Sequence, residues 1–213
     1  AFPSSHAFSL FFKNAQTVEI TATDDAGSGV AGTKYFVSDV SYASPEALEA
    51  AAKEQWKTYS NSFTIAPNSK NVIYAKATDK MGNVGYASSN GIVLYTDAAL
   101  STPSISFTKT GTDAVTLNGN TVDEIYCGSD MLTAGTDYTV SDGGTITFYA
   151  SWLNTLSAGD HTLTVHYNPL GVLYVADAGN DAPGTTSIAL SVEKAAGSVA
   201  ITNDISKVYD GAM

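Results

Sequence analysis

Short stretches in which apolar and polar residues alternate run along most of the chain. The clearest covers residues 17–23, where Val18, Ile20 and Ala22 fall on one side and polar residues on the other. A period of two residues is typical of a β-strand with one buried face. Similar stretches predict strands at 7–12, 33–38, 63–65, 72–78, 91–96, 105–108, 114–117, 121–126, 138–140, 145–149, 161–167 and 186–192. The pattern therefore predicts an all-β fold.

One segment has helical spacing instead. Ser44 is a suitable N-cap, Pro45 suits the first helical position, and glutamates follow near the positive end of the helix. Apolar side chains then share one helical face: Leu48, Ala52, Trp56 and Tyr59. We expect one short helix that packs this face on a sheet, with Trp56 as its anchor. A platform for an aromatic ligand at Trp56 is the alternative.

Two dipeptides, Asn118-Gly119 and Asp142-Gly143, lie between predicted strands. Both central residues of a type I′ turn need positive φ, which Gly, Asn and Asp tolerate, so each dipeptide predicts a tight hairpin. The run at 168–185 is an insertion between two predicted strands. Its centre, GVLYVAD, would add an edge strand, and the Gly, Asn, Asp and Pro residues after it predict an exposed loop.

The predicted elements fall into two groups separated by a short linker near residues 97–103. Several short strands with frequent turns fit a sandwich of the immunoglobulin type. We therefore expect two tandem immunoglobulin-like β-sandwiches, at 1–98 and 99–193, the first with one short α-helix. Residues 194–213 are too few to form a core and would be the truncated start of a third repeat. The chain would then be a piece of a longer protein.

The charge of the chain argues against several partners. The formal net charge is −11, from 21 acidic residues against 10 lysines, with no arginine. Nucleic-acid binding and docking on anionic membranes both depend on basic residues. The single cysteine, Cys127, excludes an intrachain disulfide and does not provide the cluster that zinc needs. No apolar stretch approaches the roughly 20 residues of a membrane span. We expect a monomer that binds neither nucleic acid nor membrane.

Five segments of the second predicted sandwich carry a resemblance to a known family: SISFTK, LNGN, LTAGTDYTVS, WLNTLSAGDHTLTV and IALSV. With them it resembles the X-two immunoglobulin-like module of cellulosome scaffolds, bacterial glycoside hydrolases and surface proteins. The insertion at 168–185 departs from the shorter turn that is usual there. The resemblance implies an extracellular spacer and solubiliser, with weak attachment to polysaccharide or cell wall in some members.

The rest of the chain resembles repeats of bacterial surface proteins. SGV followed by YFVS, the helix with Trp56, and VIYAKATDKMGNV resemble the immunoglobulin-like repeats of Gram-positive surface proteins. The tail KVYDG resembles the start of a YDG repeat of large bacterial surface proteins. Together these resemblances imply an extracellular protein that is secreted or anchored to the cell wall.

Four side chains form a candidate calcium site: Asp24 and Asp25 in DDAGSG, and Asp79 and Asn83 in DKMGN. Both segments lie in loops at strand ends, so the two loops would converge at one pole of the sandwich. Carboxylate and amide oxygens are the ligands that Ca²⁺ needs. Neither loop has the spacing of an EF-hand, and Asp or Asn near Gly also makes ordinary turns through bonds to the backbone. Calcium and simple turns are both open at this point, and no other cofactor is predicted.

No catalytic constellation is recognisable in the sequence. His161 and His166 are five residues apart, so in a strand they would point to opposite faces. There is no GxSxG nucleophile turn, and no carboxylate pair has a context that implies burial and a raised pKa. We therefore expect a protein that is not an enzyme.

Surface aromatic rings are the remaining candidates for a site, because sugar faces stack on Tyr and Trp rings. Tyr167 and Tyr174, which flank the insertion, are predicted to be an exposed ligand-binding pair, and core packing is the alternative. The leading functional hypothesis is a non-catalytic stalk or spacer of a cell-surface protein, used in adhesion to a cell wall or host surface. The rival is a module that binds polysaccharide or cell wall, as an accessory to a secreted glycoside hydrolase.

Overall fold

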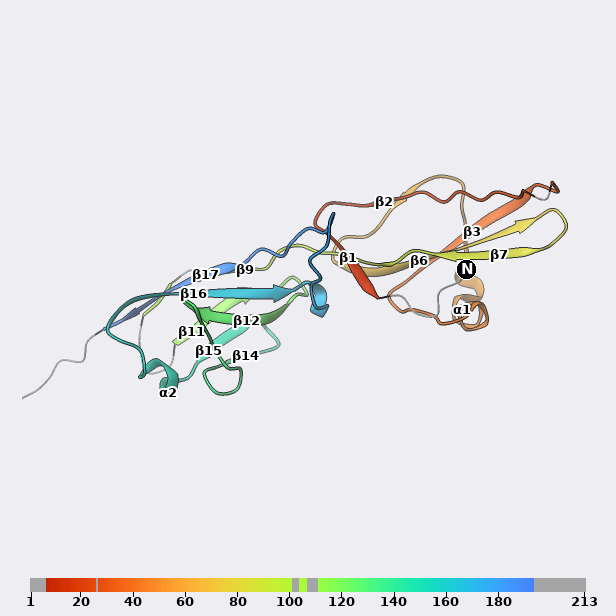
Figure 1. The fold of residues 1–213 in the computed structure, drawn as a ribbon. Coiled ribbons are helices and arrows are strands. Elements are labelled where there is room, and N and C mark those ends of the chain that lie inside the picture. Colours follow the sequence, from red (N-terminus) through yellow and green to blue (C-terminus); the bar gives the residue numbers. More distant parts are fainter. Residues whose placement is uncertain (1–6, 26, 101–103, 107–110, 194–213) are drawn as a thin grey trace, which may run out of the picture.

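A computed structural model describes residues 7–25, 27–100, 104–106 and 111–193. The third repeat expected at 194–213, with its KVYDG tail, lies outside the described residues. Most of the regular structure in the described chain is β-strand, arranged as two modules that lie end to end (Figure 1). The predicted all-β fold is confirmed.

The N-terminal module contains one large sheet and one small one. The large sheet has the order β1-β8-β6-β3-β4, with β7 also paired to β6, and the small sheet pairs β2 with β5. Its strands are β1 (Phe8–Phe12), β2 (Thr17–Val18), β3 (Val30–Ser38), β4 (Lys57–Thr58), β5 (Phe63–Thr64), β6 (Ser69–Asp79), β7 (Val84–Ser88) and β8 (Gly91–Leu94).

The strand predicted at 17–23 is the largest difference in this module. Val18, Ile20 and Ala22 are half-buried and the residues between them are exposed, as the alternation predicts. Asp24, just beyond the segment, is also half-buried. Only β2 pairs with another strand, however, because the amide of Ile20 donates to the Tyr59 hydroxyl at 3.0 Å instead of to a ladder. A side-chain acceptor therefore ends this strand early, which alternation alone does not reveal.

The predicted helix is present as α1 (Pro45–Ala52), followed by the 3-10 turn η1 (Lys53–Gln55). The Ser44 hydroxyl accepts from the amide of Ala47 at 3.2 Å, so the predicted N-cap is confirmed. Leu48 and Ala52 are buried in the core with residues of β3 and β6. The predicted stripe is wrong beyond Ala52, because the backbone leaves the helical conformation at Lys53 with φ +31°.

Trp56 follows the helix and closes a polar cluster around Glu49. The Glu49 carboxylate accepts from Lys76 Nζ at 2.6 Å, from the Tyr86 hydroxyl at 2.9 Å and from Trp56 Nε1 at 3.1 Å. Lys76 Nζ also lies 4.3 Å from the centre of the Trp56 ring. The cluster ties α1 to β6 and β7, and it uses Trp56 as a packing residue, as the anchor interpretation predicts.

This cluster makes the stability of the N-terminal module depend on pH. Partial burial opposes ionisation of Glu49, but the bonds from Lys76, Tyr86 and Trp56 together outweigh it and lower the pKa of Glu49 below 4.5. A carboxyl whose pKa is lower in the folded state stabilises the fold above its unfolded pKa and loses that contribution as the pH falls through the folded pKa. We expect about 1 kcal/mol to be lost from pH 6 to pH 3 through this group. Urea unfolding should show that Glu49→Gln removes this part of the pH dependence, whereas Glu54→Gln, at an exposed glutamate of η1, keeps it.

The C-terminal module is a sandwich of two sheets, with orders β10-β17-β16-β12-β13 and β14-β15-β11-β9. Its elements are β9 (Ala99–Leu100), β10 (Ser104–Ser106), β11 (Gly111–Thr116), β12 (Thr121–Cys127), β13 (Asp130–Met131), β14 (Tyr138–Val140), β15 (Thr145–Phe148), α2 (Ala150–Leu153), β16 (Gly159–Asn168), η2 (Pro169–Gly171) and β17 (Thr186–Val192). In both modules an early strand pairs in parallel with the last one, β1 with β8 and β10 with β17.

One continuous core fills the C-terminal sandwich. The buried side chains come from both sheets and from α2: Val115, Ile125, Leu132, Tyr138, Ile146, Phe148, Leu153, Leu163, Val165, Tyr167, Ile188, Leu190 and Val192. Trp152 packs its ring 5.5 Å from Phe148. Ala98 is buried in the same core and β9 pairs with β11, so the chain enters this module at residues assigned to the linker.

Of the two predicted hairpin turns, the one at Asn118-Gly119 has the expected backbone conformation, but it joins β11 and β12, which lie in different sheets, so no hairpin forms there. Asn118 and Gly119 both have positive φ, at 52° and 84°, as a type I′ turn requires. The turn at Asp142-Gly143 does join a hairpin, because β14 pairs antiparallel with β15. Its predicted type I′ geometry is wrong, because the residue with positive φ is Gly144 at 83° and not Asp142 or Gly143. The turn closes with the amide of Gly144 on the carbonyl of Ser141 at 2.9 Å.

The insertion does not form the predicted edge strand. Residues 169–184, here called the joint segment, continue from η2 without a strand and lie against β1 and the end of β8. The ring of Tyr174 packs edge-on against Phe11 at 5.1 Å. It belongs to a small apolar cluster shared by the two modules, with Val93 and Tyr95 on one side and Leu170 and Val172 on the other.

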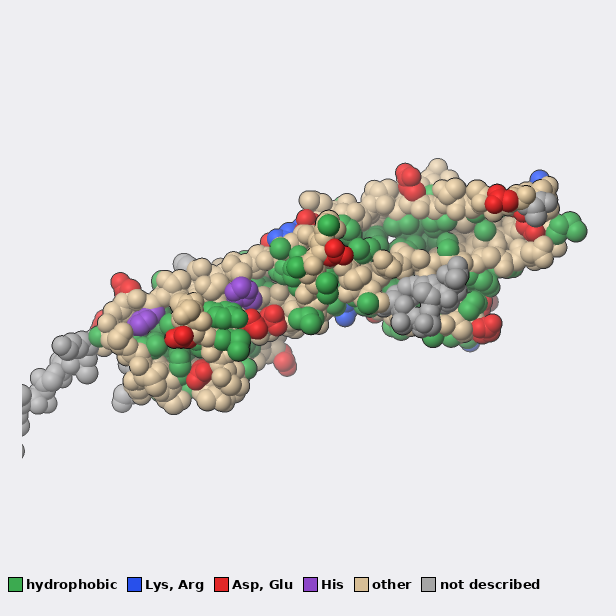
Figure 2. All heavy atoms as spheres, viewed as in Figure 1, with side chains coloured by type: hydrophobic (Ala, Val, Ile, Leu, Met, Phe, Trp, Pro, Cys, Tyr) green, Lys and Arg blue, Asp and Glu red, His purple; other side chains and the backbone are tan. Residues whose placement is uncertain are grey.

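Hydrogen bonds complete the contact between the modules. Asn180 accepts from the amide of Phe11 at 3.0 Å and donates to the carbonyl of Ser9 at 2.8 Å. Asp181 accepts from the amide of Lys13 at 2.8 Å, and its carbonyl accepts from the Tyr95 hydroxyl at 2.6 Å. The amide of Asp181 also donates to the carbonyl of Phe11 at 2.8 Å, so the joint segment pairs with the free side of β1 through both backbone and side chains. Hydrophobic side chains gather on the surface where the modules meet (Figure 2).

Candidate functional site

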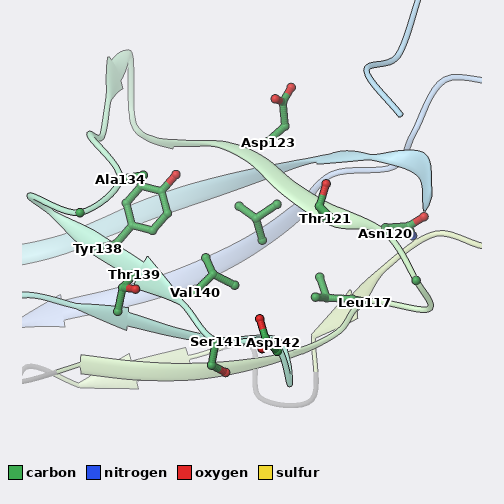
Figure 3. A pocket seen from close by; sticks show the side chains of 13 residues that line it. Leu117, Asn120, Thr121, Asp123, Ala134, Tyr138, Thr139, Val140, Ser141 and Asp142 are labelled. Atoms are coloured by element: carbon green, nitrogen blue, oxygen red, sulfur yellow. The ribbon is translucent and has the colours of Figure 1, made fainter. Parts of the chain in front are cut away.

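A groove in the C-terminal module lies between the edge of β12 and β14. It has a volume of about 660 Å³ and is here called the β12–β14 groove. Leu117, Val122 and Val140, which pack against the core of the module, form its apolar floor. Polar side chains stand around it (Figure 3). The groove lies where the two sheets of the sandwich separate, so its floor is continuous with the core.

A β-bulge in β12 shapes one wall of the groove. Val122 pairs with Tyr167 and Ile125 with Val165, so two residues of β12, Asp123 and Glu124, oppose a single residue of β16. A bulge adds one residue and redirects the side chains around it. Val122 and Ile125 therefore both face inward although they are three positions apart, and Asp123 is exposed at the rim.

Tyr138 supplies the polar group at the base of the groove. Its side chain is 4% exposed and packs 6.4 Å from Phe148. Its hydroxyl points toward β12 (Figure 3), and within the described residues it has no hydrogen-bond partner. Burial, and then the charges of Asp123 and Glu124, raise the pKa of Tyr138. The hydroxyl is therefore protonated at neutral pH and free to donate to, or accept from, a group in the groove.

The rim is polar and partly fixed in place. Thr121, Thr139, Ser141 and Asp142 are exposed on both sides of the opening. Asp123 accepts from Asn168 Nδ2 at 2.9 Å, which leaves its second carboxylate oxygen for other donors. Hydroxyls and carboxylates around an apolar floor can bond the hydroxyl or amine groups of a ligand while its apolar face rests on the valines.

Asn120 holds the end of the groove that lies next to the joint segment. It is 3% exposed, donates to the carbonyl of Thr96 at 2.7 Å and accepts from the amide of Leu170 at 3.0 Å. With both ends of its amide bonded, Asn120 is a structural residue and not a free ligand group.

The structure separates the two tyrosines predicted to form an exposed pair. Tyr167 is 3% exposed, and its hydroxyl bonds the hydroxyl of Thr186, so the predicted exposure is wrong. Its position in β16 is paired with Val122, and the inward face of that strand points into the core. Tyr174 is half-buried against Phe11 at the joint. Packing occupies both rings.

The two loops predicted to converge at one pole do so. The amide of Lys80 donates to the carbonyl of Gly29 at 3.0 Å. Asp24 accepts from Ser28 Oγ and from the amide of Gly29 at 2.7 and 2.8 Å, and Asp79 accepts from the amides of Met81 and Asn83 at 2.8 Å each. These bonds are those of ordinary turns.

Within the described ranges, no three His, Cys, Asp or Glu side chains gather closely enough to hold a metal. Asp25 is exposed, and the side-chain amide of Asn83 donates from Nδ2 to Asp79 at 2.7 Å. Calcium binding by Asp24, Asp25, Asp79 and Asn83 stays a prediction, which melting the chain with calcium and with chelator would check.

Sequence reasoning placed no site at Tyr138 and missed the groove beside it. The signal was present in β12, where Asp123 and Glu124 break the alternation between Val122 and Ile125. Two consecutive acidic residues inside a predicted strand indicate a bulge or an irregular edge. The opening over the free Tyr138 hydroxyl depends on how the two sheets pack, which the local sequence does not show.

Residues 100–171 match the family described as Carbohydrate binding domain X2. This match confirms the resemblance of the second predicted sandwich to the X-two module, whereas the surface-repeat and YDG resemblances stay predictions. No curated protein matches the chain.

Several solved structures are similar to parts of the chain. A tri-modular GH5 (subfamily 4) endo-β-1,4-glucanase of Bacillus licheniformis, complexed with cellotetraose, matches 46% of this chain and 18% of its own length, with 21% identity and a TM-score of 0.36. Extracellular domains 3–5 of Drosophila OTK match 90% and 60%, with 12% identity and a TM-score of 0.40. SGBP-B of Bacteroides ovatus, in complex with a mixed-linkage heptasaccharide, matches 88% and 43%, with 13% identity and a TM-score of 0.27. The chain therefore spans less than a fifth of the glucanase.

Proposed function

We propose that this chain is a non-catalytic accessory segment of an extracellular protein and that its β12–β14 groove binds carbohydrate. The observation that carries the proposal is the match of residues 100–171 to a carbohydrate-binding domain, because every residue that lines the groove falls inside this range. Among the described helices, none is long and apolar enough to cross a membrane.

The chemistry of the groove supports a sugar ligand. The valine floor offers an apolar surface for the face of a sugar ring, and the rim offers hydroxyls and carboxylates to its equatorial groups. The Tyr138 hydroxyl, which has no partner among the described residues, would bond a hydroxyl of the sugar, and its ring is held in place by the core.

The test is retention of the full chain on insoluble cellulose, chitin and purified cell walls. Tyr138→Phe removes the hydroxyl and keeps the ring in the core, so we expect retention to weaken about three- to tenfold from the loss of one hydrogen bond. Tyr126→Phe is the matched control, because the Tyr126 hydroxyl bonds Glu124 away from the groove. The proposal would be contradicted if the chain bound none of the three supports, or if the two variants were retained equally.

A second role as a spacer is favoured by the joint between the modules. The joint segment covers the free side of β1 with bonds from Asn180 and Asp181, so the angle between the modules is set by contacts as well as by the linker. In this role the chain holds a neighbouring part of its parent protein at a fixed distance from the bound polysaccharide. Whether that parent is an adhesin of a Gram-positive cell wall or a secreted glycoside hydrolase is decided by the neighbouring domains.

A further inference from the structure

The charge of the C-terminal module narrows the class of carbohydrate that its groove would take. From residue 111 to residue 193 the sequence contains eight Asp and two Glu and neither lysine nor arginine. Acidic side chains stand over this module on the face shown in Figure 2. A polysaccharide that carries carboxylates, sulfates or phosphates would therefore meet repulsion without any compensating cation in this range.

Two of these carboxylates lie at the groove itself. Asp123 stands on the β12 side and Asp142 follows β14 on the opposite side (Figure 3). Asp123 is positioned by the bulge and held by Asn168, and no described group bonds the carboxylate of Asp142. The rim thus presents negative charge from both sides of the opening.

The Tyr138 hydroxyl is an independent sign that the groove receives a ligand. It belongs to a side chain that is 96% buried, it has no partner in the described residues, and it lies at the groove that Asp123 and Asp142 also line. Acidic residues alone would form an ordinary solvated surface and would not indicate a ligand. An unpartnered hydroxyl on a side chain held in the core adds a fixed polar contact at the base of the groove.

We infer that the β12–β14 groove is selective for a glycan with protonated amines, such as the glucosamine units of a de-N-acetylated chitin-like chain. The ammonium group pairs with Asp123 and Asp142 at the rim, while a ring hydroxyl bonds Tyr138 at the base. This inference rests on the proposed function and adds the charge of the ligand to it. Acetylation of the amine removes the positive charge and adds bulk at the place where the carboxylates stand.

Calorimetric titration of the full chain with matched hexasaccharides tests the inference. The probes are the hexamer of glucosamine, the hexamer of N-acetylglucosamine and cellohexaose. Each is titrated at low salt and at about 0.5 M salt, at which interactions between surface charges are strongly screened. We expect the glucosamine hexamer to bind about three- to tenfold more tightly than the other two at low salt, from two exposed ion pairs. This advantage should largely disappear at high salt.

Two double variants separate local contacts from net charge. Asp123→Asn with Asp142→Asn should abolish the preference for the glucosamine hexamer and retain binding of cellohexaose. Asp130→Asn with Asp160→Asn changes the net charge equally at exposed positions outside the groove and should keep the preference. Equal affinities for the three hexamers would overturn the inference and leave the proposed function in place. No binding of any hexamer would contradict both.

Discussion

Replacing Gly144 by alanine is expected to destabilise the C-terminal module by about 3 kcal/mol. Gly144 has φ +83°, a conformation that costs an L-residue energy, and a Cβ at this position would lie 2.2 Å from the carbonyl oxygen of Val115. That oxygen is part of the backbone of β11. The same strand also bonds the turn, because the amide of Val115 donates to the carbonyl of Gly144. Because the clash involves backbone on both sides, the strand must move.

Thermal unfolding of the full chain would measure this effect. In a module of this size a loss of about 3 kcal/mol lowers the melting temperature by more than about 10 °C. The neighbouring Gly143→Ala is the matched control, because φ of Gly143 is not positive and the nearest atom to its added Cβ is Ser141 Oγ at 3.9 Å. Equal melting temperatures for the two variants would contradict the turn geometry.

Replacing Tyr174 by alanine is expected to loosen the joint between the modules. The Tyr174 ring is half-buried against Phe11, and its loss leaves the shared apolar cluster without its largest side chain from the joint segment. We expect a cost of about 2 kcal/mol, or roughly a 30-fold increase in the open population of the joint. Each module keeps its own core, so unfolding of the modules should change little.

The hydrogen-exchange rates of two backbone amides would measure this opening. The amides of Phe11 and Lys13 donate to side chains of Asn180 and Asp181 across the joint, so their exchange depends on its opening. Both should exchange faster by a similar factor in Tyr174→Ala. Leu173→Ala is the control, since the adjacent Leu173 is 69% exposed and its loss should leave both rates unchanged. Unaltered protection of Phe11 in Tyr174→Ala would show that the polar bonds alone hold the joint.

The strands of the C-terminal module could be predicted closely from the sequence. All seven strands expected there are present, because alternation and turn residues act over a few neighbouring positions and are written in the local sequence. The short β9 and β13 were missed, since two residues cannot display a period. β7 was missed because Val84, Gly85 and Ala87 are exposed and give it no buried face.

The features that matter most for the site could not be predicted in the same way. Tyr167 and Tyr138 are both buried tyrosines in predicted strands, and only the placement of β12 and β14 in separate sheets decides that Tyr138 also lines the groove. The role of Tyr174 depends on a partner ring 163 positions earlier in the chain, Phe11. Long-range pairings of this kind are set by the packing of whole sheets, which no local pattern encodes.

The parallel pairing of β1 with β8 and of β10 with β17 determines how a module would carry tension along the chain. When the entering strand and the leaving strand run side by side in the same direction, a pull on the two ends slides them past each other along their length. The hydrogen bonds between them are then loaded in shear, all at once, and not peeled apart one after another. A segment built in this way transmits force through its backbone pairings before either core has to open.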